Sequence, residues 1–139
     1  KLNARPIVMK KILVPLFSLM MSFNAYGEWT LVAEGESDDN ILTFYVDFDS
    51  IKIKGNVYYW ELVDKLKPDQ YGDLSLKSLF EVNCNAPRKR RVLSALYYTE
   101  SMGRGSTSTN DNQTRPWTYS PPDSVGAVSL NSACIHANQ

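Results

Sequence analysis

Two cysteines constrain the fold of this chain more than any other feature, because each lies on the apolar side of its own predicted element. Cys84 ends the run 74–84, whose even-numbered positions are mostly apolar, as in a half-buried strand. Cys134 lies in the apolar stretch 127–135 and shares a helical stripe with Leu130. We therefore predict that a C-terminal helix lies across an antiparallel sheet and is tied to it by a Cys84–Cys134 disulfide.

The first part of the sequence predicts export. Met9, Lys10 and Lys11 begin a charged segment, an apolar run follows at 12–23, and Ala25-Tyr26-Gly27 places small residues where a signal peptidase reads them. The alternative, a retained anchor helix, requires about 20 apolar residues. The expected division is an upstream extension, a signal peptide and one domain, at residues 1–8, 9–27 and 28–139.

Export predicts that the two cysteines form a disulfide, because an oxidising compartment favours the bond. The alternative is two unpaired buried thiols. The residues around the expected cleavage site include no cysteine, so no lipid anchor is evident. No second apolar span follows, so we expect no stable membrane insertion after signal cleavage. The expected location is periplasmic or secreted.

The charge balance argues against nucleic acid as a partner. The chain has 15 basic and 15 acidic residues, and four of the basic ones precede Glu28. The expected mature domain therefore has 15 − 4 = 11 basic and 15 acidic residues, a net charge near −4. A protein that binds nucleic acid normally shows a basic footprint.

Alternating patterns and turn residues predict an α+β fold, an antiparallel sheet of about five to six strands with a C-terminal helix packed on one face. The acidic segment 34–40 reads as a turn and the polar segment 106–114 as a mobile loop. Asp123 or Ser124 is a candidate cap for the helix. The expected strands are 29–33, 41–48, 51–54, 57–64, 74–84 and 88–99.

The order of these motifs resembles the surface-adhesin protein E-like family of small exported bacterial proteins. The resemblance rests on Tyr45-Val46-Asp47, Ser50-Ile51-Lys52, Gly55-Asn56-Val57, Trp60-Glu61-Leu62, Met102-Gly103-Arg104-Gly105, Trp117 and the two cysteines. It covers roughly residues 28–137. It implies an antiparallel sheet, a C-terminal helix and a cysteine bridge. The family's namesake is a surface lipoprotein that binds host extracellular-matrix and serum proteins, and this chain differs from it in having no lipid-accepting cysteine.

No pattern indicates catalysis, a cofactor or a metal. The only histidine, His136, is the fourth residue from the end of the sequence, and no Gly-x-Ser-x-Gly elbow is present. Asp47 and Asp49 are two residues apart, but they read as a capped turn at Ser50. Cys134 and His136 do not share a helical face, so they make a poor metal pair. We therefore predict a protein that is not an enzyme.

Two groups of residues are candidates for binding. The run Arg88, Lys89, Arg90 and Arg91 could form a cationic patch, or it could be a solvated hairpin end that opposes aggregation. The pairs Tyr58-Tyr59 and Tyr97-Tyr98 place one aromatic side chain on each face of their strands, where they could serve only as core and cross-strand packing. If the sheet face opposite the helix is exposed, they form a patch for a partner, and we select Tyr59 and Tyr97 as its contacts.

The sequence thus predicts an exported, non-enzymatic, adhesin-like module that engages a protein partner through an exposed sheet face. The partner is a host protein, an envelope protein or a second copy of the chain. The alternative is a periplasmic structural or stress accessory protein that binds a small ligand or an envelope component.

Overall fold

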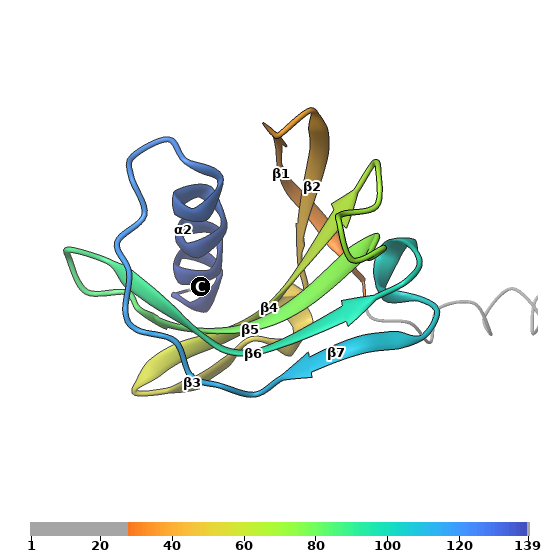
Figure 1. Ribbon diagram of the computed structural model, residues 1–139. Helices are drawn as coiled ribbons and strands as arrows, with labels where there is room; N and C mark the ends of the chain where they lie inside the picture. Colours follow the sequence, from red (N-terminus) through yellow and green to blue (C-terminus); the bar gives the residue numbers. More distant parts are fainter. Residues whose placement is uncertain (1–27, 139) are drawn as a thin grey trace, which may run out of the picture.

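The computed structural model describes residues 28–138, so the predicted extension and signal peptide lie outside the described part of the chain. It contains one seven-stranded antiparallel sheet and a C-terminal helix (Figure 1). The predicted α+β class is confirmed, with one strand more than expected. In chain order the elements are β1 (Thr30–Ser37), β2 (Asn40–Val46), η2 (Phe48–Ser50), β3 (Lys52–Lys54), β4 (Asn56–Lys65), β5 (Ser75–Asn83), β6 (Lys89–Tyr98), η3 (Ser101–Gly103), β7 (Thr107–Asp111) and α2 (Val125–Ala137).

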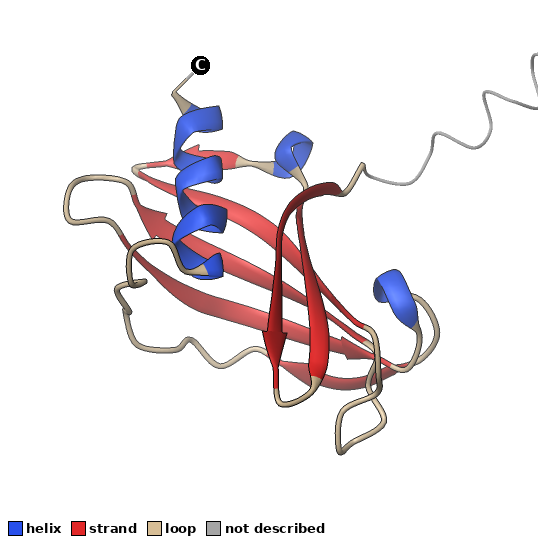
Figure 2. Cartoon of the chain, turned by 90° about the horizontal axis from the view of Figure 1, so that it is seen from above, coloured by secondary structure: helices blue, strands red, loops and turns tan. Residues whose placement is uncertain are grey.

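The strands follow one another across the sheet as a meander. Their order is β1-β2-β4-β5-β6-β7, and β3 pairs with the beginning of β4 through a turn at Gly55. Gly55 has a φ of 73°, a conformation that glycine adopts without steric cost. The sheet is strongly curved, and α2 lies across its concave side (Figures 1 and 2).

The acidic segment after residue 33 is a strand, which corrects the predicted turn. β1 continues to Ser37, and only Asp38 and Asp39 form the turn into β2, both with positive φ. The prediction failed because β1 is an edge strand whose glutamates are exposed to solvent, so its hydrogen-bonded backbone tolerates polar side chains. Aspartate also tolerates the left-handed conformation better than most residues.

The segment predicted as a mobile loop contains β7. Residues Thr107–Asp111 pair with the second half of β6, although none of their side chains is apolar. The chain after β7 then continues along the first half of β6, where Arg115 donates to the carbonyl of Val92 and Thr118 exchanges two backbone hydrogen bonds with Arg90. We call residues 112–124 the strap, because they connect β7 to α2 along the edge of β6.

Helix α2 begins where the sequence predicts. Ser124 is the N-cap, and its hydroxyl accepts a hydrogen bond from the Ala127 amide at 3.2 Å. The predicted Cys84–Cys134 disulfide is present, with the two Cα atoms 5.8 Å apart. Within the described residues there are no free cysteines. The helix is therefore both capped and covalently held on the sheet.

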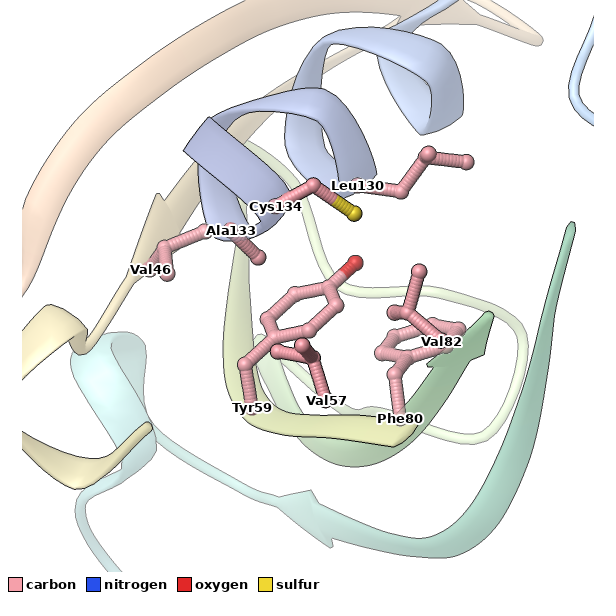
Figure 3. Close-up of a cluster of buried hydrophobic side chains, with 8 residues drawn as sticks. All are labelled: Val46, Val57, Tyr59, Phe80, Val82, Leu130, Ala133 and Cys134. Carbon is pink, nitrogen blue, oxygen red and sulfur yellow. The ribbon is translucent and has the colours of Figure 1, made fainter. Parts of the chain in front are cut away.

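The core lies between α2 and the concave side of the sheet (Figure 3). Because directly opposed residues in an antiparallel pair point to the same face, the pairs Val57–Val82 and Tyr59–Phe80 lie together beneath the helix. The core cluster contains Val46, Val57, Tyr59, Phe80, Val82, Leu130, Ala133 and Cys134.

The other side of the sheet is not covered by α2, and we call it the open face. From β4, β5 and β6 it carries Tyr58, Trp60, Lys77, Leu79, Glu81, Lys89, Arg91, Ser94, Leu96 and Tyr98. The turn η3 lies at one end of it, where Met102 and Gly103 donate backbone hydrogen bonds to Asp64 and Ser75. No helix within residues 28–138 is long and apolar enough to span a bilayer.

Candidate functional site

The basic run does not form one patch, because β6 sends alternate side chains to opposite faces. Arg88 and Arg90 lie on the side of α2: Arg88 donates to the Asn131 side chain at 2.7 Å and to the Cys84 carbonyl at 3.2 Å. Lys89 and Arg91 lie on the open face, opposite Asn83 and Glu81 of β5. The single cationic patch suggested by the sequence is therefore divided into two pairs.

Arg90 is the centre of a buried polar network beneath α2. Its Nη1 atom donates to the Tyr59 hydroxyl at 2.7 Å and to Glu61 Oε2 at 3.1 Å. Ser129 of α2 completes the network, since its hydroxyl bonds that of Tyr59 at 2.9 Å and also donates to Glu61. Gly126 makes this approach possible, because a Cβ atom there would lie 2.9 Å from an Arg90 nitrogen. The network joins the helix to the sheet.

Tyr59 is part of this network and is fully buried. Burial raises the pKa of its hydroxyl, and the neighbouring Glu61 carboxylate raises it further, so the group stays protonated and continues to donate. Figure 3 shows the hydroxyl pointing toward α2. This position corrects the prediction that Tyr59 lies on the exposed face, because the helix covers the side of β4 to which it points.

Tyr97 lies on the same side of the sheet as Tyr59. It pairs with Leu76, which in turn opposes Val63 on the concave side. With Tyr71 and Asp73 it lines a hollow of about 520 Å³. The tyrosines of the open face are instead Tyr58 and Tyr98.

The side chains considered for catalysis have other roles. Cys134 is in the disulfide, and the His136 ring packs against Phe48 in a tilted arrangement with centroids 4.9 Å apart. Asp49 lies within the turn η2, which Asp47 precedes. In the part of the chain that the structure describes, no three His, Cys, Asp or Glu side chains gather in a way that could hold a metal ion.

The open face has its own polar centre at Glu81. Arg91 forms an ion pair with Glu81 Oε1 at 2.7 Å, while Asn56 and Tyr58 donate to Oε2 at 2.9 and 3.0 Å. The side chain of Glu81 is only 9% exposed. Burial alone raises the pKa of Glu81, but the hydrogen bonds from Asn56, Arg91 and Tyr58 outweigh burial and hold this pKa below its ordinary value.

This lowered pKa predicts a specific loss of stability in acid. Because the pKa of Glu81 is lower in the folded chain than in the unfolded chain, its contribution is complete above the ordinary value of 4.5 and disappears as the pH falls through the folded pKa. We expect Glu81→Gln to flatten the decline of the free energy of unfolding below about pH 4.5, measured by urea denaturation. Glu34→Gln, on the exposed strand β1, is the control, and equal slopes in the two variants would contradict the assignment.

Aromatic and cationic side chains alternate over the rest of the open face. Trp117 of the strap lies beside both open-face members of the basic run, 5.2 Å from Lys89 Nζ and 4.5 Å from Arg91 Cζ, measured to the ring centroid. At the other end, Lys77 lies between the rings of Trp29 and Tyr98, at 5.7 and 5.2 Å. Such contacts hold long cationic side chains in fixed positions on the surface.

An apolar group extends over the open face from the middle of the sheet to the end at Lys77. It consists of the half-buried side chains Trp60, Leu79, Leu96 and Tyr98, from three neighbouring strands. The sequence did not single out this group, although the alternation of β4 and β5 was visible. The missing information was which side of the sheet the helix covers.

Comparison with known proteins identifies a family that this sequence matches. The sequence model of a protein family, surface-adhesin protein E, matches residues 29–135. This range includes β1 to β7, the strap and nearly all of α2. Searches among curated proteins and among solved structures gave no match.

Proposed function

This chain belongs to the surface-adhesin protein E family, and from that premise we propose that it is an exported adhesive module that engages a host extracellular-matrix protein through the open face. An adhesin acts by binding other proteins or host factors, so the proposal concerns where and how it binds. The resemblance and the predicted signal segment support export.

One observation supports the open face as the binding surface. Its apolar group of Trp60, Leu79, Leu96 and Tyr98 keeps partial exposure in a chain whose other sheet face is covered by α2. Aromatic and aliphatic side chains that lie close together at the surface are typical of the centre of protein interfaces. The ion pair and the fixed cations at the margins provide the polar rim that such interfaces have.

The test places a charge in the middle of this group. Ser94 opposes Leu79 on the open face, so Ser94→Glu adds a carboxylate there without removing a core side chain. We expect binding of the oxidised, exported protein to immobilised basement-membrane extract to weaken at least tenfold, because the carboxylate would be buried unpaired in the interface. The readout is the dissociation constant from biolayer interferometry.

Ile135→Glu is the matched control, because Ile135 is 58% exposed on the outer side of α2. It makes the same kind of change on the opposite side of the molecule, and we expect it to leave the affinity within twofold. Near-ultraviolet circular dichroism of both variants confirms that they are folded. Equal affinity of Ser94→Glu and the unchanged protein would exclude the open face as the site.

A further inference from the structure

The register of the sheet places two lysines that are distant in sequence in the same rows as the open-face half of the basic run. Lys52 opposes Tyr58, Tyr58 opposes Glu81, and Glu81 opposes Arg91, so the four side chains form one row across β3, β4, β5 and β6. Because directly opposed residues share a face, both ends of this row are cations on the open face.

A second row lies beside the first. Lys54 opposes Asn56 at the β3 end, and Asn83 opposes Lys89 at the β6 end. Both pairs lie on the open face, by the same alternation that places Tyr58 and Glu81 there. With neighbouring strands about 4.8 Å apart, the cations of each row are separated by roughly 14 Å. The result is a pair of cations at each side of a broad surface.

The positive charge of this region is mostly uncompensated. The two rows contain one carboxylate, that of Glu81, which is buried and already paired with Arg91. No salt bridge found between residues 28 and 138 includes Lys52, Lys54 or Lys89. Lys52 and Lys54 are also exposed to solvent. Three ammonium groups therefore remain available to an anion.

Trp117 gives this region an aromatic component. Its ring contacts Lys89 and Arg91 and is itself half-buried, so its position is fixed. The amides of Asn56 and Asn83, between the cations, can donate and accept hydrogen bonds. We call this end of the open face, made of Lys52, Lys54, Lys89, Arg91 and Trp117, the cationic platform.

We propose that the cationic platform binds a sulfated glycan chain. This inference rests on the proposed function, since it names a second component of the host matrix that the same face would contact. Sulfate groups pair with the three available lysines, and hydroxyl groups of the sugar bond the two asparagines. Trp117 contributes by holding Lys89 and Arg91 in position. An extended polymer fits the spacing of the cations, because it can reach both sides of the platform at once.

The probe is a heparin decasaccharide, titrated into the oxidised, exported protein at 0.15 M salt. The test variant is Lys52→Gln/Lys54→Gln, which removes two exposed charges without touching the core. We expect its dissociation constant to rise at least tenfold and the salt dependence of binding to become shallower. The control is Lys67→Gln/Arg104→Gln, which removes the same charge from exposed positions outside the platform, and we expect a change below twofold.

Three results would overturn the inference: no binding of the decasaccharide, an equal loss in both double variants, or equal binding of fully desulfated heparin. Equal affinity for a single-stranded oligonucleotide of the same charge would also overturn it, because the platform would then recognise polyanions in general. Trp117→Leu provides an independent check, and a loss of affinity for heparin at unchanged salt dependence is expected.

Heparinase treatment of the matrix extract separates this inference from the proposed function. In one outcome the protein binds the treated extract, Ser94→Glu abolishes this binding, and heparin does not bind. That outcome would support the proposed function and reject the glycan inference. In the other outcome the protein binds heparin through Lys52 and Lys54 but does not bind the treated extract. That outcome would support the glycan inference and reject the proposed function.

Discussion

Replacing Cys134 with serine is expected to lower the free energy of unfolding of the oxidised protein by about 4 kcal/mol. The bond to Cys84 closes a loop of 50 positions, and a cross-link over such a loop removes conformational entropy of this size from the unfolded chain. For a domain whose total stability is about 5–15 kcal/mol, the loss is a large fraction. Urea denaturation followed by far-ultraviolet circular dichroism measures it.

The double variant Cys84→Ser/Cys134→Ser and the reduced, unchanged protein are the controls. Both lack the cross-link, so the free energy of unfolding of each is expected to be close to that of Cys134→Ser. A loss below about 1 kcal/mol in all three would show that packing and the network at Arg90 hold α2 without the bond.

Replacing Arg90 with methionine is expected to lower the free energy of unfolding by about 3–5 kcal/mol. The ion pair with Glu61 is buried, with side-chain exposures of 15% for Arg90 and 4% for Glu61. Methionine fills the space over the Phe80 ring but leaves the carboxylate buried without its cation, and an uncompensated buried charge costs this amount. Urea denaturation at neutral pH measures the change.

Arg88→Met is the matched control, two residues away on the same side of β6. Arg88 donates only to neutral groups, a carbonyl and an amide, so about 1 kcal/mol is the expected loss. Glu61→Gln in the Arg90→Met background should restore part of the stability, because it removes the stranded charge. An Arg90→Met loss no larger than that of Arg88→Met would contradict the role of the network.

The disulfide, the helix and the two faces of the central strands could be predicted because each depends on a local pattern. Cys84 follows an alternating run, Cys134 lies on an apolar helical stripe, and Tyr59 alternates with Tyr58. Period-two and period-3.6 patterns report which side chains lie together, and the structure confirms those groupings. They do not report which group the helix covers, and for that reason the predicted exposed tyrosines were misplaced.

Strand β7 and the last part of β1 could not be predicted from side-chain character. Both are polar edge strands, and each is held by backbone hydrogen bonds to the strand next to it in the chain, β2 for β1 and β6 for β7. An edge strand needs no apolar face, so its composition resembles that of a loop.

The candidate site was the part most dependent on pairing between distant segments. Lys52 and Lys54 read as an alternating strand with no relation to Lys89, and only the register across β4 and β5 joins them. Counting along β6 also fails, because a bulge opposite Leu79 and Phe80 reverses the alternation, so that Arg91 and Tyr97 point to opposite sides.

The cystine also determines how this module would respond to pulling. Force applied to the two ends of the chain passes directly from position 84 to position 134 through the sulfur atoms, so the 50 positions between them cannot be drawn out. At roughly 3.4 Å per residue, the bond withholds about 170 Å of extension. β6, β7 and most of α2 lie between the two cysteines. Under flow, the part of the open face that contains Arg91 and Trp117 would therefore bear no direct tension, and the strands before Cys84 would carry the load.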